Sequence, residues 1–353
     1  MKVTRYLYAA AIMMACAFGM QSCSVEDNPS DSIDPVTSIL SEIQGGATLN
    51  DLIANYAENN TLVLPSAVTI EIKDAVELNA PLTITTDGKP ATIVAKAGFK
   101  TNSAISFENV VIDAAEVTTP FIQLADVTLE GEEKAKVIDI ISFTNVKVSD
   151  LKYQLIYANK QSYLVKAIKV ENSIFAIDGT NKKTIFDFNG GGNTELLSIN
   201  NSTIYANPSN GQNGGFFSTQ SGKEVTDLGG ETFAITITNS TLYNITNSKT
   251  VNTLRKNSQT YQKYTVKNNI VVDCGKSGQF LKGLNSGQAG KDENWDVDGN
   301  CFNFGGAVIT EQKIGSSDDN IKNSIEAVVS FADVDKGDFT QSNAKAGDPR
   351  WIK

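Results

Sequence analysis

The segment LSINNSTIYA, Leu197–Ala206, decides the fold because the chain repeats its pattern until there are seven copies. The other copies are ISFENVVIDA from Ile105, ISFTNVKVSD from Ile141, IKVENSIFAI from Ile168, ITITNSTLYN from Ile235, YTVKNNIVVD from Tyr264 and a degraded WDVDGNCFNF from Trp295. The residues equivalent to Asn201 lie 27–38 residues apart and are Asn109, Asn145, Asn172, Asn239, Asn268 and Gly299. Repeats of this period cannot each bury their own apolar face, so they indicate a solenoid.

Each copy has the pattern of a strand, a sharp corner and a second strand. The positions four and two residues before the aligned Asn, and three residues after it, are apolar in every copy. This alternation is typical of strands, and its phase slips by one residue after the Asn. Asn and Gly tolerate the left-handed backbone conformation that such a corner requires. We therefore expect stacked corners whose Asn amides hydrogen-bond to one another between layers.

The segments between the copies lack a helical pattern, which favours a parallel β-helix over a leucine-rich repeat. The repeats resemble the right-handed β-helix of pectate-lyase-like proteins, including the asparagine ladder at one corner. The predicted fold is all-β, a right-handed parallel β-helix (solenoid) with a short α-helical N-terminal cap. We assign residues 39–104 to the cap and first layers, 105–304 to the repeats and 305–353 to a C-terminal cap, in which 320–331 forms a short helix or strand.

Charge and composition exclude several functions. The net charge of −10 argues against nucleic acid as a partner. The chain contains no histidine, which removes Ser-His-Asp catalysis and histidine-ligated metal sites. Cys274 and Cys301 are the only cysteines beyond the N-terminal leader. They form either one disulfide between layers or, as we expect by default, two buried thiols.

The N-terminus has the features of an export signal. Residues 1–22 combine a positively charged start with a short apolar core, and Ser22-Cys23 precedes a polar, acidic stretch. This junction resembles a bacterial lipoprotein processing site, which implies lipidation of Cys23; the alternative is an ordinary cleaved signal. Residues 23–38 are predicted to be a flexible tether. Glu26 and Asp27 resemble the surface-export signal of Bacteroidetes lipoproteins, so we expect a lipid anchor in the outer membrane and display on the cell surface.

A second recurrent run lies between the corner copies, and its outward positions are predicted to stack from layer to layer. These positions are Tyr157, Asp187, Ser218, Thr253 and Lys282, with Asn159, Asn189, Gln220 and Arg255 beside them. Pectate-lyase-like proteins place a polysaccharide groove on such a face. A row with a spacing of about 4.8 Å suits an extended polymer. The alternative is that the face is polar only for solubility.

Two further hypotheses concern chemistry and aromatic contacts. Elimination on an acidic glycan would use Arg255, Lys256 or Lys282 as the base, with Asp187 helping to hold calcium. The acidic residues for a calcium site are sparse, so we expect no cofactor and leave enzymatic activity open, leaning against it.

Tyr205 and Tyr243 hold the same place in consecutive copies. They form either an outward platform for sugar rings or an edge-packed pair.

The tail FADVDKGDFTQSNAKAGDPRW, Phe331–Trp351, resembles the ending of β-helical lipoproteins of unknown function from Bacteroidetes polysaccharide-utilisation systems. The resemblance implies a non-catalytic, surface-anchored lipoprotein that binds polysaccharide and that works with other glycan-uptake proteins. A neutral glycan suits the acidic chain better than a polyuronate. A calcium-dependent polysaccharide lyase and an adhesin-like scaffold are the alternatives.

Overall fold

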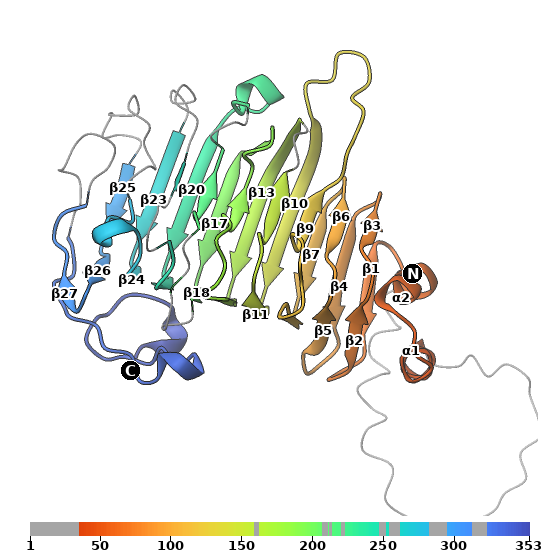
Figure 1. The fold of residues 1–353 in the computed structure, drawn as a ribbon, viewed down its shortest axis with the longest axis horizontal. Helices are drawn as coiled ribbons and strands as arrows, with labels where there is room; N and C mark the ends of the chain where they lie inside the picture. The colour runs from red at the N-terminus through yellow and green to blue at the C-terminus, as the bar shows by residue number, and fades with distance from the viewer. Residues whose placement is uncertain are drawn as a thin grey trace, which may run out of the picture. The chain divides into compact units, whose positions relative to one another are not determined.

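The computed structural model describes residues 35–158, 162–206, 211, 214–219, 223–246, 252–253, 262–281, 295–312 and 323–353. Within these residues the protein is mostly β, with three long sheets and two α-helices (Figure 1). The predicted signal sequence, tether residues 23–34 and Cys23 lie outside the described residues. Within the described part of the chain, no helix has the length and apolar character needed to cross a membrane.

Strands enter three sheets in rotation, so that successive strands belong to sheet A, then B, then C. Sheet A contains β1 (Thr61–Leu64), β4 (Leu82–Thr86), β7 (Ile105–Glu108), β10 (Lys136–Thr144), β13 (Tyr163–Glu171), β17 (Leu196–Asn200), β20 (Phe233–Thr238), β23 (Gln262–Lys267) and β25 (Trp295–Asp298), with β16 (Asn193–Thr194) also paired to β13. Sheet B contains β2 (Thr69–Ile72), β5 (Ala91–Ala95), β8 (Val110–Asp113), β11 (Lys147–Leu151), β14 (Ile174–Ile177), β18 (Thr203–Ala206), β21 (Thr241–Tyr243), β24 (Ile270–Val272), β26 (Cys301–Phe304) and β27 (Ala307–Val308).

Within the described residues, sheet C is formed by the third strand of each of the first seven layers. It contains β3 (Val76–Leu78), β6 (Phe99–Thr101), β9 (Ile122–Leu124), β12 (Ile156–Ala158), β15 (Phe186–Asp187), β19 (Phe217–Ser218) and β22 (Asn252–Thr253). All described pairings in the three sheets are parallel except the terminal pair of β26 and β27. This arrangement is consistent with the predicted parallel β-helix. Most apolar positions of the three sheets face inward and form one continuous core. A second, smaller cluster joins Ile270, Val272 and Cys301 of sheet B to Val329, Ala344 and Ala346.

The predicted corners lie between sheets A and B and have the predicted conformation. The six aligned Asn residues have φ values of 47–55°, and Gly299 has a φ of 63°. Their backbone N–H groups donate to the next layer; for example, Asn145 donates to the Glu171 carbonyl at 2.9 Å. The expected amide ladder exists only in part. Asn145 Nδ2 donates to Asn109 Oδ1 at 2.9 Å, and Asn268 Nδ2 to Asn239 Oδ1 at 3.4 Å.

A second, fully buried ladder follows the corner by one residue, and the sequence analysis did not predict it. Its members have no exposed surface and are Ser173, Ser202, Ser240, Asn269 and Asn300. Each side-chain oxygen accepts the backbone N–H of the preceding layer, as in Ser173 N to Ser202 Oγ at 3.0 Å and Ser240 N to Asn269 Oδ1 at 2.9 Å. The ladder thereby pairs backbone donors that the turn leaves inside the core, where an unpaired N–H is costly.

The N-terminal cap consists of two helices, α1 (Pro35–Gln44) and α2 (Leu49–Tyr56), as the helical spacing predicted. Because α1 begins at Pro35, the helical segment includes residues 35–38, which were predicted to be part of the tether. Thr48 and Asp51 form a capping box that fixes the start of α2. Leu49 and Leu52 are fully buried against the first layer. The cap therefore covers apolar side chains that the first layer would otherwise expose.

The C-terminal segment differs from the prediction in its placement. Residues 331–353 run along the outer side of sheet B, beside the stack in Figure 1, with short 3-10 turns at Val334–Lys336 (η5) and Pro349–Trp351 (η6). Two further 3-10 turns, Thr226–Leu228 (η2) and Lys276–Gly278 (η3), lie in loops elsewhere. Residues 323–330 form neither the predicted helix nor a strand. We call residues 331–353 the C-terminal strap.

The strap is held by an ion pair between the buried Asp348 and the partly exposed Arg350, whose side chain is 35% exposed. The Asp348 side chain is fully buried and pairs with Arg350. Arg350 NH1 donates to the Asn172 carbonyl at 3.0 Å, and its NH2 donates to the Ser173 carbonyl at 2.8 Å. Asp348 Oδ2 accepts from Thr203 Oγ1 at 2.7 Å. The strap therefore fastens neighbouring layers of sheet B from outside.

We predict that Ser202→Ala lowers the free energy of unfolding by about 1–3 kcal/mol, because the buried Ser173 N–H loses its acceptor. Ser198→Ala is the matched control, since Ser198 lies at an outward position of β17 in the same layer, and we expect a change within about 0.5 kcal/mol. Denaturant unfolding measures both. Equal effects of the two substitutions would contradict the role of the buried ladder.

We predict that Arg350→Ala lowers the free energy of unfolding by about 1–3 kcal/mol, because it leaves the buried Asp348 carboxylate without its cation, while the partly exposed position of Arg350 admits water. The double variant with Asp348→Asn should recover part of this loss, because the second substitution removes the uncompensated charge. Denaturant unfolding of both variants and of the control Lys353→Ala, at an exposed position, tests the coupling. Simple additivity of the two losses would count against the ion pair.

Candidate functional site

The strand register of sheet C aligns the predicted polar row, but one predicted outward member, Ser218, is buried, with 7% of its surface exposed. Tyr157 pairs with Asp187, Asp187 with Ser218, and Ser218 with Thr253. The register extends the row toward the N-terminus through residues that the sequence analysis did not include, namely Glu77, Lys100 and Gln123. We call these seven residues the sheet C row. At about 4.8 Å per layer, its six steps span roughly 29 Å.

Tyr157 and its neighbours combine a ring with hydrogen-bonding groups. Tyr157 and Gln123 pair in sheet C, which fixes their backbones. Both residues are half-buried, so part of each side chain is exposed to solvent. Beside them, Lys183 Nζ lies 5.8 Å from the centre of the Tyr153 ring. Amphipathic rings and amides contact both the C–H faces and the hydroxyls of a sugar. This part of the row therefore has the side chains that a glycan surface needs.

Asp187 is held by the protein on both carboxylate oxygens. Its Oδ1 accepts the Asn189 backbone N–H at 3.0 Å, and its Oδ2 accepts from Gln154 Nε2 at 3.4 Å. These bonds fix the turn after β15 and orient the carboxylate. Within the described part of the chain, no group of three or more acidic or cysteine side chains is placed to hold a metal ion. The side chains of Asn159, Gln220, Thr253, Arg255, Lys256 and Lys282 lie outside the described part of the structure, so Thr253 is placed in the row by its backbone register alone.

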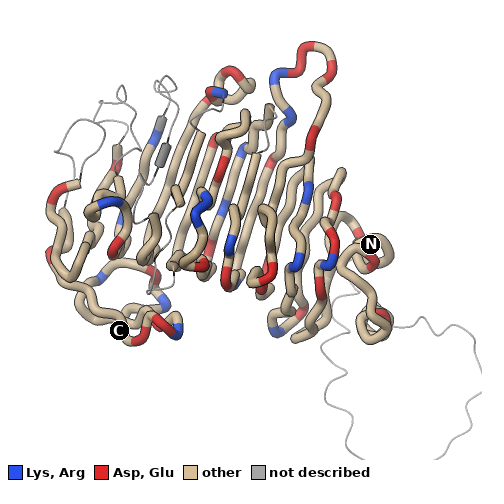
Figure 2. The backbone as a smooth tube through the Cα atoms, in the orientation of Figure 1, with Lys and Arg blue, Asp and Glu red and all other residues tan. Residues whose placement is uncertain are grey.

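At the N-terminal end, the row begins with a charged pair. Lys100 Nζ lies 3.5 Å from Glu77 Oε1, and both side chains are substantially exposed. An exposed pair of this kind contributes little to stability. Along the described chain, acidic and basic residues are interspersed over the turns and outer faces (Figure 2). The described part of the face therefore has no long run of positive charge with which to attract a polyanion.

Tyr205 and Tyr243 lie in register on the outer side of sheet B, as predicted. The strap packs against both rings. The Phe339 ring centre lies 4.9 Å from that of Tyr205 and 5.7 Å from that of Tyr243. Burial also raises the pKa of both tyrosine hydroxyls above the ordinary value. A sugar ring cannot occupy these positions while the strap is in place, so the edge-packed alternative describes this geometry.

Cys274 and Cys301 are both free thiols and both buried. Cys274 Sγ lies 3.2 Å from the Val272 carbonyl, and Cys301 Sγ 3.2 Å from the Ala327 carbonyl. Burial raises the pKa of Cys274 to about 12 and also raises that of Cys301. The structure thus has buried thiols in place of the disulfide that the sequence left open.

These features define a mostly β protein with long parallel sheets, an arrangement consistent with a parallel β-helix. Residues 67–207 match the model of a family described as a domain of unknown function, DUF4957. The match covers the first layers and the first four repeat copies, which is less than half of the 353 residues. No curated protein and no solved structure matches the chain.

We predict that Cys274 resists alkylation by iodoacetamide at pH 8 in the folded protein, because burial keeps the thiol protonated and out of contact with the reagent. In denaturant it should react like an ordinary cysteine. Peptide mass spectrometry measures the modified fraction of each cysteine. Rapid labelling of Cys274 in the folded state, or a peptide linked through Cys274 and Cys301, would contradict the prediction.

Proposed function

We propose that this chain is a surface-anchored lipoprotein built as a right-handed parallel β-helix, and that it binds polysaccharide along the sheet C row without cleaving it. The observation that carries the proposal is the continuous register from Glu77 to Thr253. A polymer presents the same groups at regular intervals, and the outward positions from Glu77 to Asp187 present side chains at a regular interval of their own. Right-handedness follows the strong preference of parallel crossover connections.

The chemistry of the row favours a neutral glycan. Glu77 and Lys100 offset each other, and Asp187 is the remaining charged member of the row. Neutral sugars are recognised through hydrogen bonds to hydroxyls and through ring contacts, which Gln123 and Tyr157 supply. A polyuronate would meet an acidic protein with net charge −10 and would need a bridging cation. Binding without cleavage also agrees with the structural use of both Asp187 oxygens.

The lipid anchor and surface display rest on the sequence around Cys23 and on its resemblance to Bacteroidetes lipoproteins. In such a setting the sheet C row would be available to polysaccharide outside the cell. The bound polymer would then be passed to other glycan-uptake proteins, which are the proposed partners. Labelling of intact cells with a membrane-impermeant reagent tests the display.

Native gels cast with single polysaccharides test the binding. We expect the full chain to be retarded in one neutral polysaccharide, with the polymer left unbroken on staining. The double variant Gln123→Ala with Tyr157→Ala should bind about tenfold more weakly, equivalent to about 1.4 kcal/mol, because it removes an amide and a ring from adjacent layers. Thr236→Ala, on the outer face of sheet A, is the matched control and should bind like the unmodified chain.

Two outcomes would overturn this proposal. A cleared zone in the stained gel would make the protein a lyase and direct attention to Asp187, Arg255 and Lys282. Unchanged migration in every polysaccharide, with calcium also supplied, would support the structural scaffold.

A further inference from the structure

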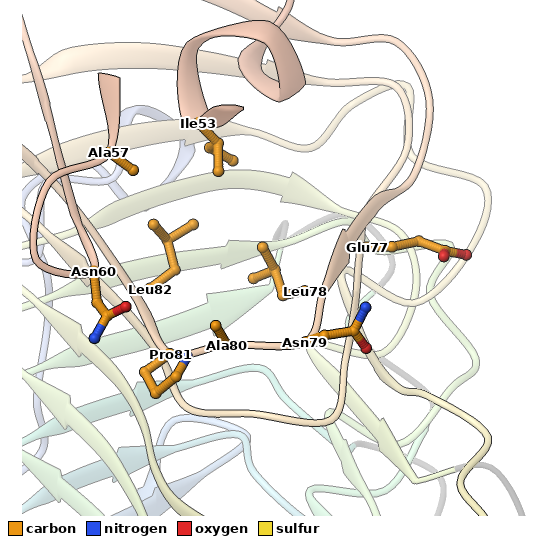
Figure 3. A pocket seen from close by; sticks show the side chains of 9 residues that line it. All are labelled: Ile53, Ala57, Asn60, Glu77, Leu78, Asn79, Ala80, Pro81 and Leu82. Atoms are coloured by element: carbon orange, nitrogen blue, oxygen red, sulfur yellow. The ribbon is translucent and has the colours of Figure 1, made fainter. Parts of the chain in front are cut away.

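A pocket lies at the N-terminal end of the solenoid, where the cap meets the first layer (Figure 3). Its volume is about 300 Å³. This is the lower end of the range for small-molecule sites and suits one compact group better than a peptide segment. It is lined by two parts of the chain, the end of α2 with the following turn and the end of β3 with its turn into β4, which contribute Ile53, Ala57, Asn60, Glu77, Leu78, Asn79, Ala80, Pro81 and Leu82.

The interior of the pocket is apolar. Ile53 and Ala57 project from the cap toward Leu78 and Leu82, which rise from the first layer (Figure 3). Leu78 and Leu82 are 6% and 5% exposed, so they are core residues that the cap does not quite cover. The pocket persists because its lining includes alanines, Ala57 and Ala80, where larger side chains would fill it. An apolar interior of this size favours a methyl group over a hydroxyl.

The rim of the pocket is polar and partly pre-oriented. The amides of Asn60 and Asn79 lie on opposite sides of the apolar centre (Figure 3). Asn79 Oδ1 accepts from Asn102 Nδ2 at 2.8 Å, which fixes the orientation of the amide. Two amides around an apolar centre suit a molecule with a methyl group inside and hydroxyl or carbonyl groups at its edge.

Glu77 links the pocket to the sheet C row, because it is both a lining residue of the pocket and the first member of the row. Its carboxylate points away from the apolar centre (Figure 3), so a polymer that follows the row toward the N-terminus would meet the rim of the pocket at the first layer. We propose that the pocket seats the terminal sugar of the bound polysaccharide and selects one that carries a methyl group, either a 6-deoxyhexose or an N-acetylated sugar. This inference rests on the proposed function, since the row must bring the polymer there.

Saturation-transfer NMR with free sugars tests the pocket apart from the row. The probes are L-fucose, L-rhamnose and N-acetylglucosamine, with glucose as the sugar without a methyl group. With the full chain we expect saturation to be strongest at the methyl protons of one probe class and at least about fivefold weaker for glucose, a difference of roughly 1 kcal/mol, in line with burial of one methyl group. The responding class distinguishes a deoxy sugar from an acetylated one.

Ala80→Trp fills the pocket from an exposed position and should abolish the methyl signal. Ala54→Trp, at an exposed position of α2 outside the pocket, is the matched control and should keep it. If Ala80→Trp does not fold, as judged by its unfolding midpoint, Ala80→Leu replaces it. A methyl signal that survives pocket filling would overturn the inference, as would the absence of any signal from the unmodified chain.

The same variants separate the two proposals. Ala80→Trp should still be retarded by long polysaccharide in a native gel, because the row is intact. The double variant Gln123→Ala with Tyr157→Ala should lose retardation and keep the methyl signal. Retardation without a methyl signal would overturn the pocket alone, whereas a methyl signal without retardation in any polysaccharide would overturn the row.

Discussion

The left-handed corner between sheets A and B is the constraint on which the remainder of the structure depends. A single residue in the left-handed conformation turns the chain sharply, and the side chain of the next residue then points into the core. The backbone N–H of that next residue is buried as well, so it needs a hydrogen-bond acceptor. In most layers that residue is Ser or Asn, and it accepts a buried backbone N–H from the layer before. Two adjacent positions are thus determined together, one by backbone sterics and the other by the need to pair a buried donor.

The sequence predicted the features of the structure that recur in each layer. The slip in apolar phase after Asn201 located the corners, and alignment of the second run placed Tyr157 and Asp187 in register. The strands β3 and β6 were missed because three residues are too few to show an alternation. A second set of left-handed residues, at the end of sheet B strands, also escaped notice because it recurs in few layers, at Asp150, Asn244 and Asp273.

The strap and the pocket were not predictable because their contacts join parts of the chain that do not repeat. Arg350 binds a carbonyl 178 residues earlier, and no periodicity connects the two positions. Likewise, Tyr205 and Tyr243 were correctly paired, but nothing in their own copies indicated that Phe339 would cover them. The pocket is built from irregular first-layer residues such as Ile53 and Leu78. Sequence patterns thus describe the layers, and tertiary contacts determine which outer surfaces stay open.

The strap has a consequence for how such a chain can change length during evolution. A duplicated layer with Ser or Asn after its corner would bring its own acceptor and donor, so the buried ladder tolerates whole-layer insertions. The strap does not, because it contacts fixed points from Asn172 to Asn268. An added layer there would move one end by about 4.8 Å, beyond hydrogen-bond reach. Length variation is therefore expected among the layers before Asn172, whereas the strap fixes the number of layers between Asn172 and Asn268.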